Sequence, residues 1–146
     1  MFKNTLIKAT EAAGVVIKEY FDKQFTISNK EGINNLVTEV DHKSEEVIIA
    51  VIKDAFPSHY ILSEEAGEMA QDSEYKWIID PIDGTVNYAN GIPICCVSIG
   101  LEKNGKMIMG AVFNPFMNEF FGAERGLGAT LNNKPIHVSN KTEVIK

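Results

Sequence analysis

The chain has 146 residues, with 14 Lys and Arg against 20 Asp and Glu, and 45% of its residues are hydrophobic. These values are ordinary for one globular domain with its own core, so we expect residues 1–146 to form a single domain. A net charge of -6 would repel a phosphate backbone, which excludes nucleic acid as an expected partner. There is no membrane-length apolar run, and N-terminal lysines do not fit a signal peptide, so we expect a cytoplasmic protein without membrane contact.

Two helices are predicted in the first part of the chain. Apolar residues recur at three- and four-residue spacing over residues 2–21, as in an amphipathic helix. The same pattern over residues 47–55 predicts a second helix, which Pro57 ends. The region between them, residues 25–37, is interpreted as a short strand or hairpin around Gly32.

The rest of the chain is typical of strands. Residues 60–63 and 77–80 are short apolar runs that end in acidic residues, and a short helix is expected at 86–90. Further strands are expected at 94–102, 107–113, 119–123 and 129–131, with turns at 103–106 and 132–135. Two helices followed by hairpin-connected strands predict an α+β fold, with the two helices packed on one face of a largely antiparallel sheet.

The most informative stretch is an apolar strand that leads into two carboxylates, Asp80 and Asp83. Between and after them, Pro81 fixes its own φ and Gly84 tolerates unusual backbone angles, so a tight turn can aim both carboxylates at one point. Mg²⁺ prefers such oxygen ligands, usually together with substrate phosphate. Backbone N–H groups at Gly84 and Thr85 can face a phosphate oxygen. The alternative is structural: Asp83 caps a helix and Asp80 ends a strand.

Two further acidic segments bear on this choice. Glu64 and Glu65 follow another short strand; alone they are typical of solvated surface, but beside Asp80 and Asp83 they would repel unless a cation neutralised them. The segment at 36–41 reads Leu-Val-Thr-Glu-Val-Asp. By residue type it is a helix-capping segment, with Thr38 or Asp41 as the cap of the second helix.

Together, these segments resemble the inositol monophosphatase family. The resemblance rests on the segment at 36–41, the paired glutamates, and the run at 80–85 that reads Asp-Pro-Ile-Asp-Gly-Thr, followed by Val-Asn-Tyr. It continues through 91–93 and 97–100, so it covers nearly the whole chain. It implies a Mg²⁺-dependent, lithium-sensitive phosphatase of the layered sugar-phosphatase fold, commonly a homodimer, that uses a metal-activated water on a small phosphorylated polyol or sugar.

The resemblance also implies roles for individual residues. Two or three Mg²⁺ ions are implied: the first held by Glu64, Asp80 and the Ile82 carbonyl, the second by Asp80 and Asp83, and a looser third by Glu64. Thr85 and Asp41 would activate the attacking water, and the phosphate would bind the backbone region of Asp83, Gly84 and Thr85. Lys30 matches a basic residue near the family's site. Glu65, next to Glu64, is the first carboxylate that we would expect to take over if a ligand of the second metal ion were missing. Ser63 stands where the family most often has glycine.

The family implies a chain about twice as long, whose second half carries a Trp-Asp motif that completes the second metal site. The single tryptophan here, Trp77, is not part of such a motif. We therefore expect an N-terminal half that binds Mg²⁺ weakly, has little activity alone, and docks with a C-terminal half. Inositol-1-phosphate is the expected substrate. The alternatives are a fructose-1,6-bisphosphatase, a 3′-nucleotide bisphosphate phosphatase, or a non-catalytic metal- or phosphate-binding fragment with exposed Phe113, Phe116, Phe120 and Phe121.

Overall fold

The computed structural model describes residues 1–24, 30–64 and 66–142, with side chains described for 1–21, 37–64 and 66–142. Two long helices come first, α1 (Phe2–Gln24) and α2 (Lys30–Ala55), and a short helix α3 (Thr85–Ala89) lies between strands. The strands are β1 (Tyr60–Ser63), β2 (Gly67–Met69), β3 (Tyr75–Asp83), β4 (Cys96–Lys103), β5 (Lys106–Asn114), β6 (Glu119–Glu124), β7 (Gly128–Leu131) and β8 (Lys134–Ile136). None of the helices in these ranges has the length and apolar content to span a membrane.

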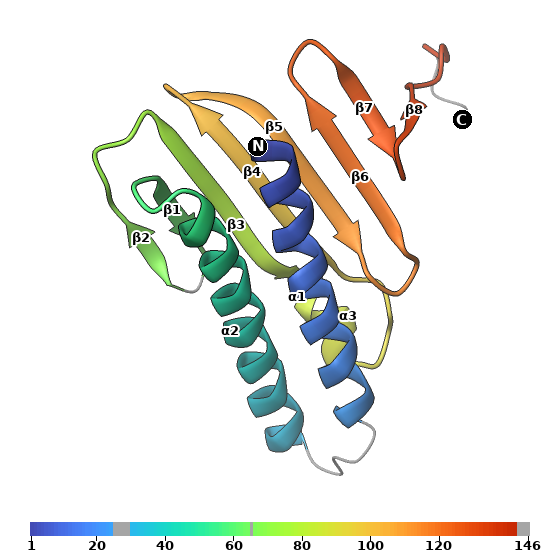
Figure 1. The fold of residues 1–146 in the computed structure, drawn as a ribbon. Helices are drawn as coiled ribbons and strands as arrows, with labels where there is room; N and C mark the ends of the chain where they lie inside the picture. The colour runs from blue at the N-terminus through green and yellow to red at the C-terminus, as the bar shows by residue number, and fades with distance from the viewer. Residues whose placement is uncertain (25–29, 65, 143–146) are drawn as a thin grey trace.

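All the strands join one sheet in the order β2-β1-β3-β4-β5-β6-β7-β8. Every neighbouring pair is antiparallel except β1 and β3, which run parallel. Both long helices lie side by side on one face of this sheet, where α1 packs on β4 and β5 and α2 packs on β3 (Figure 1). The predicted α+β fold, with helices on one face of a largely antiparallel sheet, is confirmed.

The core lies between the helices and the central strands. Alternate residues of a strand point to opposite faces, and the fully buried Trp77, Val97 and Leu101 belong to the set that faces the helices. Ile17 of α1 and Ile48 of α2 are equally buried and belong to the same cluster. The three-four spacing therefore places one apolar stripe of each helix against one apolar face of the sheet.

The second helix starts much earlier than predicted. It begins at Lys30, so the strand or hairpin expected around Gly32 is wrong over residues 30–37; residues 25–29 lie outside the description. Thr38 and Asp41 are interior residues of this helix and cap nothing. The β-branched residues of the segment favour a strand locally, but helices in proteins are held mainly by tertiary packing, and fully buried Val40 continues the apolar stripe toward the N-terminus.

The other predicted elements are confirmed with small shifts, and two short strands were missed. The helix expected at 86–90 is α3, one residue earlier. The stretch at 134–135 is not a turn, because it pairs with β7 as the edge strand β8. Strand β2 pairs with β1 at the opposite edge. Both strands have only three residues, too few to show an alternating pattern.

The opposite face of the sheet carries exposed apolar side chains. Val112 of β5 and Phe121 of β6 are cross-strand partners, 38% and 37% exposed, and Met107 lies over Gly100. These residues border a shallow groove of about 440 Å³. Within the described ranges, both long helices lie on the other face (Figure 1), and we call this one the uncovered face. Of the four phenylalanines expected to be exposed, only Phe121 is; Phe113, Phe116 and Phe120 are half-buried.

Candidate metal and phosphate site

Asp80 and Asp83 lie at the C-terminal end of β3, and a one-residue bulge sets their direction. Asp80 is paired with Ser98 and Asp83 with Cys96, so three steps along β3 match two steps along β4. In a regular strand, residues three apart point to opposite faces. Because cross-strand partners share a face and the two β4 residues are two apart, the bulge turns both carboxylates to the uncovered face. The bulge therefore sets both residues on one face of the sheet, and their aim at a single point stays a prediction.

Glu64 is brought to the same place by the parallel pairing of β1 with β3. Ser63 is in register with Ile79, and the backbone N–H of Glu64 donates to the Ile79 carbonyl at 3.2 Å. Since Glu64 comes directly after Ser63 and Asp80 directly after Ile79, the two acidic residues occupy equivalent positions on neighbouring strands. Its side chain is exposed, so it can turn toward a ligand at the strand ends.

The electrostatics of Asp80 indicate a site with too much negative charge. Burial, together with the neighbouring charges of Glu64 and Asp83, raises the pKa of Asp80 to about 6. In the described part of the chain, its buried Oδ1 atom has no hydrogen-bond partner. A buried carboxylate oxygen without a donor is costly, and a cation would remove both that cost and the repulsion.

The described residues, which exclude Glu65, contain no group of three His, Cys, Asp or Glu side chains that converges as a ready metal cage. Asp80 interacts with the charges of both Glu64 and Asp83, but the three carboxylates do not converge on one point. The donor set consists of hard carboxylate oxygens, and one of them is buried and unsatisfied. These residues fit a hard cation such as Mg²⁺, which usually binds through one or two carboxylates and keeps several waters.

Gly84 makes the turn that follows Asp83, and only glycine fits there. Its φ is 92°, in the left-handed region, and an added Cβ would lie 3.0 Å from the Ile94 carbonyl oxygen. Gly84 is the N-cap of α3, and the helix has no side-chain cap. The alternative in which Asp83 caps this helix is therefore wrong. Thr85 is the first residue of α3, where backbone N–H groups lack acceptors within the helix.

The structure describes only part of what is needed to place the other predicted site residues, Asp41, Lys30 and Glu65. Asp41 is half-buried on α2, and α2 contacts α3, which begins with Thr85. Lys30 is the first residue of α2, but its side chain lies outside the description, as does all of Glu65. The structure thus places Glu64, Asp80 and Asp83 at neighbouring strand ends and sets Thr85 directly after the Gly84 turn.

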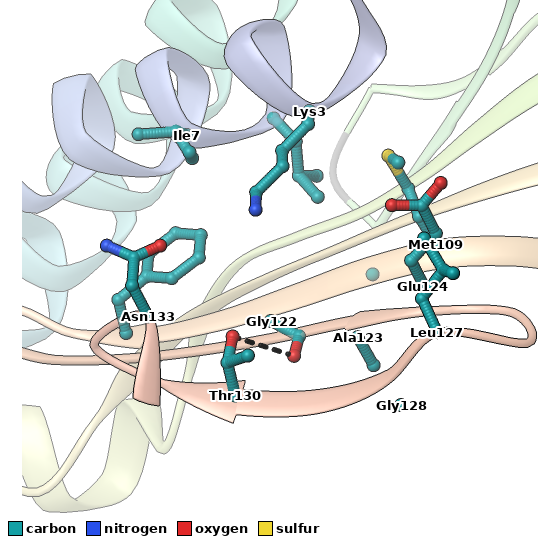
Figure 2. A pocket seen from close by; sticks show the side chains of 13 residues that line it. Lys3, Ile7, Met109, Gly122, Ala123, Glu124, Leu127, Gly128, Thr130 and Asn133 are labelled. Carbon is teal, nitrogen blue, oxygen red and sulfur yellow. Dashed lines mark hydrogen bonds between the residues drawn. The ribbon is translucent and has the colours of Figure 1, made fainter. Parts of the chain in front are cut away.

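A small hollow of the described surface lies away from these strand ends. It has a volume of about 130 Å³, and Figure 2 shows Lys3 and Ile7 of α1 facing Gly122 and Thr130 across it. Its lining is mainly apolar, and of the predicted site residues it contains none. Shape alone would point to this hollow, whereas the charge and the unsatisfied oxygen point to the strand ends. The strand ends are therefore the candidate site, because only they combine acidic side chains with an unsatisfied buried oxygen.

Comparison with known proteins decides the family. The family model described as the inositol monophosphatase family matches residues 2–146. The chain belongs to the inositol monophosphatase family. It is 44% identical over 140 residues to an inositol-1-monophosphatase of Synechocystis sp., covering 95% of this chain and 49% of the relative. It is 45% identical over 134 residues to a fructose-1,6-bisphosphatase/inositol-1-monophosphatase of Aquifex aeolicus, covering 90% and 50%.

A solved structure of this family agrees in fold. The inositol monophosphatase of Anabaena (Nostoc) sp. PCC 7120 superposes with a TM-score of 0.83 at 43% identity, covering 97% of this chain and 51% of that one. The chain therefore spans about half the length of the relatives that it matches. The predicted family and fold are confirmed.

Sequence reasoning did not single out three residues that contact the candidate site residues or their chain neighbours. Cys96 is half-buried, and its thiol donates to Asp83 Oδ2 at 3.8 Å. Burial, followed by the charges of Asp83 and Asp80, raises the pKa of Cys96 to about 11, so the thiol stays neutral. The other two, Ser44 and Glu45, are buried on α2. A polar pair that interrupts the apolar stripe of a helix was the signal that could have found them.

Proposed function

We propose that this chain supplies most of an active site for Mg²⁺-dependent hydrolysis of a small phosphate monoester, with inositol-1-phosphate as the first candidate. The observation that supports this most is the buried Oδ1 atom of Asp80, which has no hydrogen-bond partner. It lies near the charges of Glu64 and Asp83, shortly before the Gly84 turn. A surface carboxylate cluster would avoid that cost. The family membership adds that named relatives are phosphatases.

The proposed ligands form two overlapping sets that share Asp80. Glu64, Asp80 and the Ile82 carbonyl would hold one Mg²⁺, Asp80 and Asp83 a second, and Glu64 a third, looser ion. When bound, Mg²⁺ supplies positive charge to the phosphate and to the departing oxygen. Cys96 would stay outside this set, because a neutral thiol is a poor ligand for a hard cation.

The chain's own residues would bind and orient the reactants. The backbone N–H groups at Gly84 and Thr85 would donate to phosphate oxygens, as expected at the start of a helix. The Thr85 hydroxyl would hold the attacking water, and the Asp41 carboxylate would accept its proton. Lys30 would add positive charge near the phosphate. Gly84 keeps this turn close to the strand, so that the water and the phosphate can be held in line.

We also propose that the site becomes complete only when the uncovered face is covered. The chain spans about half of its relatives, and Asp80 and Asp83 open onto the same face as Val112 and Phe121. A C-terminal half of the family unit packed on this face would bury these apolar residues and reach the carboxylates. It would also bring the missing ligand of the second ion, so residues 1–146 alone should turn over slowly; loss of one preorganised electrostatic element costs about 10²–10³ in rate.

The direct test measures phosphate release with and without the C-terminal half of the Synechocystis relative added as a separate chain. The substrates are inositol-1-phosphate, fructose-1,6-bisphosphate and adenosine 3′,5′-bisphosphate. We expect the mixture to hydrolyse inositol-1-phosphate at saturating Mg²⁺ and the chain alone to be at least about 10²-fold slower. No hydrolysis by the mixture, although the two chains bind each other, would overturn the proposal. Full turnover by the chain alone would instead make Glu65 the candidate replacement ligand.

A substitution separates the metal role from the fold. Asp83→Asn should abolish Mg²⁺-dependent turnover of the mixture with inositol-1-phosphate while the chain stays folded. Its melting temperature in EDTA should be no lower than that of the wild type, because one charge that repels Asp80 is removed. The matched control is Asp54→Asn, since Asp54 is an exposed carboxylate at the end of α2. Equal turnover of both variants at saturating Mg²⁺ would remove Asp83 from the proposed ligand set.

A second candidate substrate is fructose-1,6-bisphosphate. It is favoured by the Aquifex relative, whose name carries both activities and which is 45% identical to this chain. Both reactions would use the same proposed metal ligands, so only the substrate series separates them. Faster hydrolysis of fructose-1,6-bisphosphate than of inositol-1-phosphate would favour this second candidate.

A further inference from the structure

Two adjacent residues of α2, Ser44 and Glu45, are buried although both are polar. Ser44 is 0% exposed and Glu45 is 5% exposed, in the middle of a helix whose buried neighbours along the stripe, Val40 and Ile48, are apolar. Buried polar groups in proteins are almost always hydrogen-bonded. Here their partners are the two segments that carry the acidic residues of the site.

Ser44 holds the β3 bulge. Its hydroxyl donates to the carbonyl oxygen of Pro81 at 3.0 Å, over a sequence separation of 37 residues. Pro81 lies between Asp80 and Ile82, inside the stretch where the register with β4 shifts. A bulge leaves backbone groups without their regular ladder partners, and this contact gives one of them a partner on the helix.

Glu45 holds the turn that presents Glu64. Its Oε1 atom accepts a short hydrogen bond from the Ser63 hydroxyl and a second one, at 2.9 Å, from the backbone N–H of Ala66. The two donors flank Glu64 on both sides. Ser63 is itself only 4% exposed, so this contact is shielded from competing water.

We propose that Ser44 and Glu45 are positioning residues that fix the Glu64 turn and the Asp80–Asp83 bulge at one separation. The inference rests on the proposed function, because a fixed separation of these acidic residues matters only if they bind a metal ion. Three carboxylates in one neighbourhood repel each other, and an exposed turn would relax by moving Glu64 away. Two contacts from consecutive helix residues, one to each segment, oppose that motion and keep the ligands ready for a cation.

The experiment measures Mg²⁺ affinity by calorimetry and the exchange rate of the Ala66 amide proton, both on the full chain. Glu45→Ala should weaken Mg²⁺ binding about 10-fold and speed exchange at Ala66. Glu45→Gln keeps an Oε1 acceptor for both donors, so it should stay within about 2-fold of the wild type. Glu46→Ala, on the exposed next residue of the same helix, should change neither quantity.

A stability control separates positioning from a general loss of structure. Ile48→Ala removes a fully buried side chain one turn further along α2 and should lower the melting temperature without changing Mg²⁺ affinity at temperatures where the chain is folded. Equal Mg²⁺ affinity of the Glu45→Ala and Glu46→Ala variants would overturn the inference. If Glu45→Ala does not fold, Ser63→Ala removes one of the two contacts and should weaken Mg²⁺ binding about 3-fold; unchanged affinity would overturn the inference equally.

Failure of the inference and failure of the proposed function give different results. If the wild-type chain binds no Mg²⁺ at millimolar concentration, the proposed metal site is wrong. The exchange rate of the Ala66 amide proton then shows whether Glu45 still holds the turn. Glu45 holds it if exchange is faster in Glu45→Ala than in Ile48→Ala at equal stability. If the two variants exchange alike, Glu45 has no positioning role.

Discussion

The backbone N–H of Glu64 donates to the carbonyl of Ile79 at 3.2 Å, so the chain that carries Glu64 is fixed one residue away from Asp80. This contact joins the ends of the only parallel strand pair among the described strands and fixes the backbone of Glu64 beside that of Asp80. Their repulsion is thus built into the fold, and the consequences can be measured without any substrate.

Asp80→Asn should stabilise the metal-free chain. The substitution removes a half-buried charge that is repelled by Glu64 and Asp83, and we expect a gain of about 1 kcal/mol after allowance for solvent screening. The melting temperature in EDTA should rise, and added Mg²⁺ should no longer raise it. Asp72→Asn, at an exposed position, is the control and should do neither. A lower melting temperature of Asp80→Asn in EDTA would contradict the repulsion argument.

Gly84→Ala tests the turn after Asp83. Alanine at φ 92° is strained, and its Cβ would lie 3.0 Å from the Ile94 carbonyl oxygen. Gly105→Ala is the matched control, with φ 76° and no atom within 4 Å of an added Cβ. The backbone strain alone costs about 1–2 kcal/mol, so Gly84→Ala should lower the unfolding free energy by more than Gly105→Ala in urea denaturation. Equal losses would mean that the close contact relaxes without cost.

Stability should fall in acid because of His59. Its ring is stacked between Phe56 and Tyr75, and its Nδ1 accepts a hydrogen bond from Trp77 Nε1 at 3.0 Å. Burial lowers the pKa of His59 below its ordinary value of 6.5, although the charge of Glu74 acts in the opposite direction. The unfolded chain therefore binds a proton more readily than the folded one, so this stabilisation is present above pH 6.5 and is lost as pH falls through the folded-state pKa.

The measurement for His59 is the unfolding free energy between pH 5 and pH 7.5, compared with a His59→Phe variant. The wild type should lose more stability than the variant over this range. His42→Gln, at an exposed position of α2, serves as the control and should follow the wild type. Parallel pH curves for the wild type and His59→Phe would assign the acid sensitivity to other groups.

The uncovered face should bind apolar dyes. Phe121→Lys replaces an exposed ring opposite Val112, and dye fluorescence should fall at least about 2-fold, because large exposed apolar patches are binding surfaces. Val15→Lys is the control, since Val15 is 66% exposed but lies on α1 rather than on the sheet. Addition of the C-terminal half should compete with the dye. Equal dye fluorescence of both variants would show that the uncovered face is not the surface that binds the dye.

The sequence was sufficient for features that depend on neighbouring residues. The run from Asp80 to Thr85 was recognised because its proline, glycine and carboxylates are close together, and the hairpin at Asn104-Gly105 was predicted from that pair alone. The start of α2 was not, because its β-branched residues favour a strand locally and the packing that overrides them comes from distant parts of the chain.

The supporting contacts of the site were beyond sequence reasoning for a related reason. Ser44 and Pro81 are 37 residues apart, and Glu45 and Ser63 are 18 apart. Neither pair has a local pattern, and a serine beside a glutamate on a helix is normally solvated surface. Their place on the apolar stripe between Val40 and Ile48 indicates burial, but only the tertiary arrangement shows which residues they contact. The bulge was hidden as well, because it depends on the register between β3 and β4.

That bulge makes the stretch from Asp80 to Asp83 sensitive to the number of residues rather than only to their types. Deleting one residue there would restore a regular ladder with β4. The two carboxylates, now two residues apart, would still share a face, but the strand would lose the bend and the extra residue that set their separation. Inserting one would shift Gly84 relative to Ile94 and Cys95, which it contacts closely. Conservative replacements at Ile82 leave the count intact. Insertions and deletions are therefore the changes that this part of the chain tolerates least.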